Sequence, residues 1–225
     1  MTIYQANILF TSSPTQFEVY ERGYIAVDEQ GVIQGVYHSL PDGLMYDQLV
    51  DFGDKLLIPA MNDLHVHAPQ FCNMGIAMDM QLIPWLNTYV FPEEAKFADE
   101  AYAETVYHSF VSELWRQGTM RAAVFATSHT PATQILARRF ADAGMGALIG
   151  LVGMDRHAPE NLCNTSMSWV SGMKALVDTM AEMPLVKPII TPRFIPSCTP
   201  EMLQTMGEMA QQTTLPVQSH LSENQ

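Results

Sequence analysis

Short apolar and alternating segments fill the first part of the chain, and they predict β-strands joined by turns. Residues 24–36 read as a β-hairpin, with two apolar strands on either side of a polar turn that ends in Gly31. Residues 2–10 and 55–58 have the composition of further strands. We therefore expect residues 1–58 to form a small N-terminal β domain, part of a β-sandwich.

From residue 59 onward the pattern changes to strands that alternate with helices. Val106, Phe110 and Leu114 recur every four residues, which is the apolar face of a helix. The expected strands are residues 61–67, 120–126, 147–152, 188–194 and 215–221, and the expected helices are residues 97–117, 130–144, 166–182 and 199–212. This alternation is typical of an α/β fold with a parallel sheet and right-handed crossovers.

The length of the second region bounds its architecture. Eight β/α units in about 250 residues amount to roughly 31 residues per unit. Residues 59–225 therefore hold about five units, as many as the expected strands, although the spacing alone does not separate a barrel from an open sheet. If the fold is a (β/α)8 barrel, it is truncated after about five strands, and we expect the chain to be a fragment of a longer protein.

Charge and cysteine content exclude several classes of protein. The 225 residues include 11 Lys and Arg against 24 Asp and Glu, a net charge of -13, which repels phosphate backbones, so we expect no nucleic-acid partner. Within the sequence no run of 18 or more apolar residues occurs, so we expect no membrane span. The first residues lack the pattern of a signal peptide, and the three cysteines form no C-x-x-C motif, so we expect a reduced, cytoplasmic setting.

Two histidines lie at the end of the first strand of the parallel region. His65 and His67 are two residues apart, so in a strand their side chains point to the same face, with Cβ atoms about 6.6 Å apart. Two imidazoles in this arrangement can bind one metal ion. The motif by itself is weak, because two exposed or hydrogen-bonded histidines give the same pattern.

Polar groups also follow the last two expected strands. His220 ends the final strand, with Glu223 just beyond it, and Arg193 with Phe194 ends the strand before. A carboxylate near a metal-bound water can transfer its proton, and an arginine and an aromatic ring suit a flat ligand that carries a carbonyl. Taken singly, Glu223 also reads as an acid at a helix start after Ser222, and Arg193 as a surface ion pair beside a core aromatic. The convergence of three strand ends favours one common site.

Several motifs in order resemble the guanine deaminases of the amidohydrolase superfamily. Residues 57–67 resemble the entry motif of the superfamily. The further motifs are residues 65–70, 85–92, 154–156, 187–194 and 218–224. The resemblance covers most of the chain and is strongest from residue 56 onward. One departure is Ala60, where the superfamily usually has glycine after proline, which affects the local turn rather than the chemistry.

The resemblance implies a (β/α)8 barrel of the metal-dependent hydrolase type that binds one Zn2+ per site. Its activity would be the hydrolytic deamination of guanine to xanthine and ammonia, with guanine and water as partners and a homodimer at full length. His65, His67 and His220 would bind the metal, and Glu223 would be the catalytic proton carrier. The substrate contacts would be His67, Gln70, Trp85, Arg193, Phe194, His220 and Glu223. The family's remaining zinc ligand, an aspartate on the last strand, and a histidine on the sixth strand would follow Gln225.

Two alternatives stay open at the level of sequence. One is another aminohydrolase of the superfamily that acts on an oxidised purine, a pterin or a triazine. The other is a truncated, non-catalytic remnant. The second zinc-deaminase architecture, which combines H-x-E with P-C-x-x-C, is excluded because neither pattern occurs. The acidic pair Glu93 and Glu94 reads as a solvated helix start, and we assign no site role to His38, His108 or His157.

Overall fold

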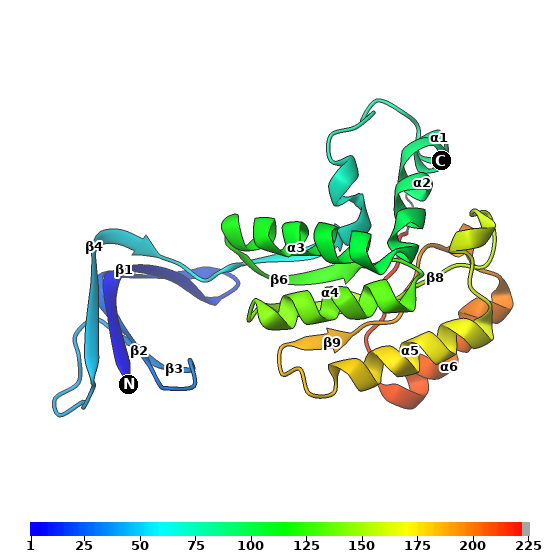
Figure 1. Ribbon diagram of the computed structural model, residues 1–225. Helices are drawn as coiled ribbons and strands as arrows, with labels where there is room; N and C mark the ends of the chain where they lie inside the picture. The colour runs from blue at the N-terminus through cyan, green and yellow to red at the C-terminus, as the bar shows by residue number, and fades with distance from the viewer. Residues whose placement is uncertain (222–225) are drawn as a thin grey trace. The chain divides into compact units, whose positions relative to one another are not determined.

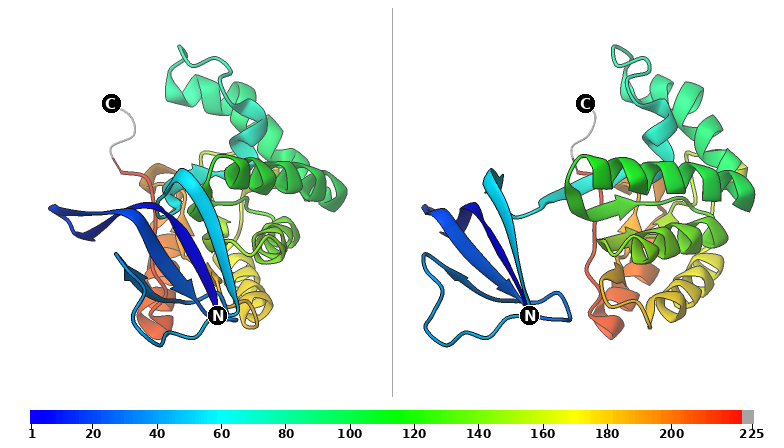
Figure 2. Two further views of the ribbon diagram at one scale, coloured as in Figure 1. Left: turned by 90° about the vertical axis from the view of Figure 1, so that its left-hand side faces the viewer. Right: turned by 60° about the vertical axis from the view of Figure 1, so that its left-hand side comes forward.

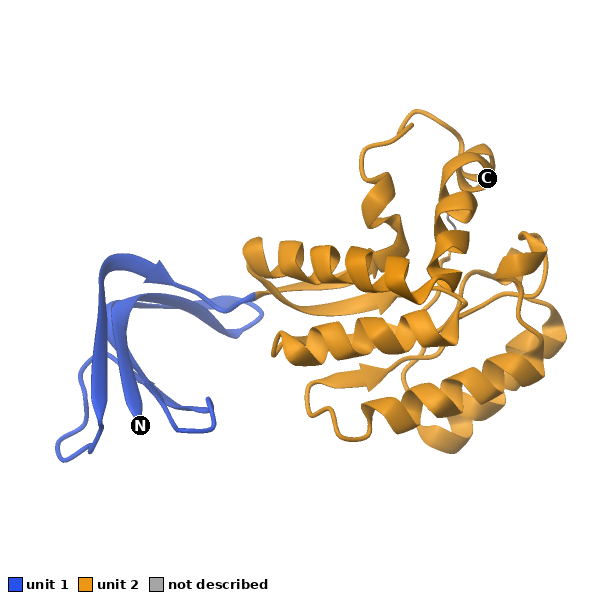
Figure 3. Ribbon diagram, in the orientation of Figure 1, with its two compact units in different colours: residues 1–60 blue, residues 61–225 orange. Residues whose placement is uncertain are grey.

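The computed structural model describes residues 1–221, which fall into two compact units. The first unit is Met1–Ala60 and the second is Met61–Gln225, coloured separately in Figure 3. The chain passes from one unit to the other just before the strand that carries His65 and His67. All described residues of the candidate site therefore belong to the second unit.

The first unit is a four-stranded mixed sheet with the order β3-β2-β1-β4. Its strands are β1 (Thr2–Ser13), β2 (Gln16–Val27), β3 (Ile33–Tyr37) and β4 (Gln48–Leu57). The predicted hairpin is formed by β2 and β3, which pair antiparallel. Its turn is held by the Asp28 carboxylate, which accepts from the backbone N–H of Val32, and Gly31 adopts a φ of 81° that favours glycine.

The second unit is built on a parallel sheet whose strands follow one another in chain order. The order is β5 (Met61–His67), β6 (Thr119–Phe125), β7 (Gly146–Gly150) and β9 (Val186–Pro188), and all neighbours are parallel. Beyond the carboxyl end of β7, the short strands β8 (Val152–Gly153) and β10 (Thr191–Pro192) continue the pairing. Figure 1 shows helices between successive strands, as the predicted α/β alternation requires.

The fifth predicted strand, residues 215–221, is less regular than expected. It pairs in parallel through two isolated bridges, Ile190 with Val217 and Phe194 with His220. Proline has no N–H, so prolines in this segment and its neighbour interrupt the ladder. The bridges still set His220 beside Phe194, just beyond the carboxyl end of β10.

Four long helices lie along one face of the sheet (Figures 1 and 2). They are α3 (Glu100–Arg116), α4 (Thr130–Asp142), α5 (Ser166–Met180) and α6 (Pro200–Thr213). The first begins at Glu100 rather than at the predicted residue 97, because the Asp99 carboxylate caps it by accepting from the N–H of Ala101. Among the helices of residues 1–221, none is both long and apolar enough to cross a bilayer.

The segment between β5 and α3, expected to be a long loop, contains short helical turns. These are η1 (Ala68–Asn73), α1 (Leu82–Trp85), the π-helical η2 (Leu86–Val90), α2 (Phe91–Glu94) and η3 (Ala95–Ala98). Three prolines, Pro69, Pro84 and Pro92, interrupt the helical pattern here and make it hard to predict from the sequence. π-Helical turns occur often at functional sites, and this one separates Trp85 from Glu94, both of which contribute to the site below.

Trp169 on α5 is the largest side chain in the core between the helices and the sheet. It is fully buried, and its indole N–H donates to the carbonyl of Leu151 at 3.2 Å. We expect Trp169→Ala to lower the free energy of unfolding by about 3–5 kcal/mol, because it removes a large packed side chain and leaves a cavity. Urea unfolding measures this, with Met167→Ala as the control, since Met167 lies on the same helix and is 83% exposed. Equal effects of both changes would contradict the assignment of Trp169 to the core.

Candidate metal and substrate site

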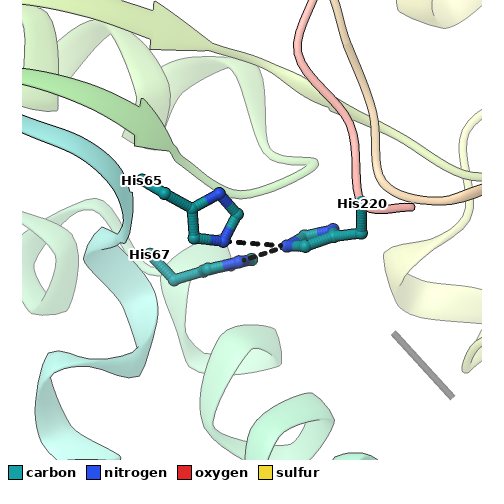
Figure 4. Close-up of side chains that lie close together, drawn as sticks. All are labelled: His65, His67 and His220. Carbon is teal, nitrogen blue, oxygen red and sulfur yellow. Dashed lines mark hydrogen bonds between the residues drawn. The ribbon is translucent and has the colours of Figure 1, made fainter. Parts of the chain in front are cut away.

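Three histidine rings converge at the carboxyl end of the parallel sheet (Figure 4). His65 and His67 come from the end of β5, and His220 comes from the segment bridged to Phe194. The Nε2 atom of His220 lies 2.9 Å from that of His67 and 3.2 Å from that of His65. One ligand nitrogen from each ring lies within 4.8 Å of the other two, which is the arrangement that a shared metal ion needs.

The spacing of these nitrogens fits a zinc ion. Zinc binds imidazole nitrogen at about 2.0–2.1 Å, so two such ligands at tetrahedral angles lie about 3.3 Å apart. The Nδ1 atom of His220 lies 2.6 Å from the backbone carbonyl oxygen of Arg193. Because a carbonyl oxygen only accepts, Nδ1 carries the hydrogen, and the lone pair of the neutral ring lies on Nε2. His220 is thereby held in the tautomer that binds a metal through Nε2.

The surroundings of His67 favour its neutral form. Burial lowers the pKa of His67 well below 6.5, and the positive charge of Arg193 lowers it further. A neutral imidazole keeps the lone pair that a metal requires. The ring of Phe125, the last residue of β6, packs against all three imidazoles, with centroid distances between 4.4 and 5.0 Å. Phe125 was not among the predicted site residues, although its place at the end of a strand next to β5 was a usable signal.

A cavity of about 250 Å³ adjoins the three imidazoles. Its walls are formed by His65, His67, Gln70, Trp85, Leu86, Arg193, Phe194 and His220. The structure therefore brings together every predicted site residue that it describes. Gln70 lies in η1 and Trp85 ends α1, so the helical turns that were expected to be loop supply one wall. Glu223, predicted as the proton carrier, lies outside the described residues.

Arg193 is held in a buried ion pair, which excludes its alternative reading as a surface residue and corrects the expectation for Glu94. Its Nη1 donates to Oε2 of Glu94 at 2.6 Å, and the two side chains are only 3% and 2% exposed. Arg193 is therefore no surface ion pair, and Glu94 is no solvated helix residue. The reason is tertiary, since the partner of Glu94 lies 99 residues away in the chain.

The remaining histidines do not join the three rings at the sheet edge. His38 belongs to the first unit, and His108 is exposed on α3. His157 holds a loop, because its Nδ1 lies 2.7 Å from a backbone carbonyl. His129 precedes α4, and burial lowers its pKa below 6.5.

Comparison with known proteins places the chain in a family. The model of the amidohydrolase family matches residues 56–225. The guanine deaminase of Dictyostelium discoideum is 35% identical over 240 residues, which cover 99% of this chain and 53% of the relative. The guanine deaminase of Homo sapiens is 36% identical over 174 residues, which cover 76% of this chain and 38% of the relative.

A solved structure matches the whole fold. The crystal structure of guanine deaminase from C. acetobutylicum, with guanine bound in its active site, is 41% identical and superposes with a TM-score of 0.94. The match covers 99% of this chain and 53% of that one, so this chain spans about half the length of such relatives. Together these matches confirm the resemblance predicted from the motifs. The chain belongs to the amidohydrolase family.

Proposed function

We propose that this chain supplies the metal-binding and substrate-binding part of a zinc-dependent guanine deaminase. The reaction is the hydrolysis of guanine to xanthine and ammonia. The observation that carries the proposal is the convergence of three imidazole Nε2 atoms on one point beside a cavity that Gln70 and Arg193 line. Relatives that carry the name guanine deaminase, one of them with guanine bound, support the choice of substrate.

In this proposal His65, His67 and His220 hold the zinc through their Nε2 atoms. Zinc, when bound, lowers the pKa of a water molecule to about 7 and so supplies a nucleophile at neutral pH. The backbone carbonyl of Arg193 keeps the Nδ1 hydrogen of His220 in place, which leaves Nε2 of that ring for the metal. Phe125 packs against the rings and covers one side of them.

The other wall residues recognise the ring. Arg193 donates to the carbonyl oxygen of guanine, where negative charge develops as water adds to the ring. The Gln70 amide both donates and accepts, which suits the alternating donors and acceptors of a purine edge. Phe194 and Trp85 pack on the faces of the ring. Glu223 takes a proton from the attacking water and delivers it to the departing amine, so that ammonia leaves as a neutral molecule.

Ammonia release from a panel of amino-heterocycles tests the proposal. We expect the full-length, zinc-loaded protein to hydrolyse guanine with a kcat/KM at least about 100-fold above that for an oxidised guanine, an aminopterin ring or an aminotriazine, because a site built around hydrogen bonds rejects rings that leave them unmade. A panel member hydrolysed faster than guanine would assign the chain to another aminohydrolase. Release of ammonia from none of them would favour a non-catalytic remnant.

Gln70→Ala should weaken guanine recognition without affecting the metal. We expect KM for guanine to rise about tenfold, which corresponds to the loss of roughly one good hydrogen-bonded pairing with the ring. Zinc content should stay at one ion per chain, because Gln70 does not belong to the histidine cluster. Gln117→Ala is the matched control, since Gln117 is exposed after α3. An unchanged KM in the Gln70 variant would remove this residue from the substrate site.

A further inference from the structure

Two residues of one short helix fix the guanidinium of Arg193. Glu94, at the end of α2, accepts a hydrogen bond from Nη1 at 2.6 Å. Phe91, at the start of the same helix, lies under the guanidinium, whose central carbon is 5.2 Å from the ring centroid. Both side chains are at least 97% buried. Arg193 therefore has little freedom to turn away from the cavity that it lines.

Within residues 1–221, the side chains of Arg193 and Glu94 form hydrogen bonds to no side chain other than each other. Glu94 is the only side chain to which the Arg193 guanidinium donates in this part of the chain. The second carboxylate oxygen of Glu94, Oε1, is buried and has no hydrogen-bond partner there. The negative charge of Glu94 is thus balanced by Arg193, and an arginine has five N–H donors, so the pair leaves others for a ligand.

The pairing changes what the cavity wall offers to a ligand. An unpaired guanidinium presents a full positive charge and attracts anions. With a carboxylate 2.6 Å away, the pair has no net charge, and a bound ring meets N–H donors of fixed direction whose attraction for an anion is weaker than that of a lone guanidinium. Such a wall suits the oxygen of a neutral carbonyl. A ligand that carries a full negative charge is also repelled by Glu94.

We propose that Glu94 is a positioning and specificity-determining residue, which acts through Arg193 and restricts the cavity to neutral, carbonyl-bearing heterocycles. The inference rests on the proposed function, which gives Arg193 the hydrogen bond to the purine carbonyl. Glu94 itself touches no reacting atom. Its carboxylate sets the direction of the guanidinium and balances its charge.

This role of Glu94 is tested by the binding of two purines that carry no exocyclic amine and so cannot be deaminated. Hypoxanthine is neutral and carries a ring carbonyl, whereas urate is an anion of similar size at neutral pH. Calorimetric titration of the zinc-loaded protein gives both affinities. We expect the wild-type protein to prefer hypoxanthine, and Glu94→Gln to weaken hypoxanthine binding about tenfold while shifting the preference toward urate by a similar factor.

Two further variants separate the charge of Glu94 from its shape and position. Glu94→Asp keeps the charge but shortens the side chain, so we expect weaker binding of both purines with the preference for hypoxanthine retained. Glu94→Gln leaves the buried guanidinium without a negative partner and can fail to fold. The Glu94→Asp variant then still provides the test. Glu93→Gln is the control, because Glu93 lies on the same helix and bonds to Lys96 and Tyr102 instead of Arg193.

The outcomes distinguish this inference from the proposed function. A ratio of the two affinities that is the same in Glu94→Gln and in the wild-type protein would overturn the inference, even where guanine is deaminated. So would loss of the preference in Glu94→Asp, or a wild-type protein that prefers urate. If guanine releases no ammonia but Glu94→Gln still shifts the preference toward urate, the proposed function is overturned and the role of Glu94 is supported.

Discussion

Replacing His220 with alanine is expected to abolish tight zinc binding and to reduce guanine turnover by at least about a thousandfold. Its Nε2 lies within 3.2 Å of the Nε2 atoms of both other imidazoles, so it occupies the centre of the cluster. With His220 absent, the cluster in residues 1–221 keeps only the two imidazoles of β5. Such a pair is too weak to compete with water for a divalent ion at low concentration, and no activated water remains for the reaction.

The measurements for this variant are zinc per chain by elemental analysis and ammonia release from guanine. His108→Ala serves as the control, because His108 is an exposed histidine on α3 in the same unit. We expect the control to keep one zinc per chain and its full rate. If the His220 variant kept a full equivalent of tightly bound zinc, His220 would not be a ligand.

Replacing Glu223 with glutamine is expected to keep the zinc and to lower turnover by about 10²–10⁴-fold, which is the usual contribution of a general acid and base. Glutamine has nearly the same size and still forms hydrogen bonds, but it cannot accept a proton from water or pass one to the leaving amine. Glu223 lies outside the described residues, so this role rests on the motif that it shares with His220.

The test of Glu223 combines zinc content with the rate of ammonia release in one preparation. Glu208→Gln is the matched control, since Glu208 is exposed on α6 and its partner there is Gln204. We expect normal zinc in both variants and a slow reaction only for Glu223→Gln. A normal rate in that variant would remove Glu223 from the mechanism, and a loss of zinc would give it a structural role.

Local patterns predicted the sheet and its histidines well. Residues 61–67 were expected as a strand and form β5 with the same bounds, because apolar residues and turn signals on both sides delimit it. The spacing of His65 and His67 then follows from the two-residue repeat of a strand. The parallel order of the sheet followed from the alternation of strands and helices.

Features that depend on distant residues were not visible in the sequence. Glu94 stands beside Glu93 near a helix start, which is the ordinary place for a solvated acid, and its burial depends on Arg193, 99 residues later. The packing of Phe125 on the imidazoles likewise requires β6 to lie next to β5. The helical turns of residues 82–94 escaped prediction because prolines and a π-helical turn break the ordinary period.

The central claim is that His65, His67 and His220 bind one zinc ion, and anomalous diffraction at the zinc edge tests it most directly. Crystals of the zinc-loaded protein should show one strong peak at the carboxyl end of the sheet, about 2.0–2.1 Å from the Nε2 atom of each of the three rings. A peak at other side chains, or none at these histidines in zinc-saturated crystals, would contradict the account.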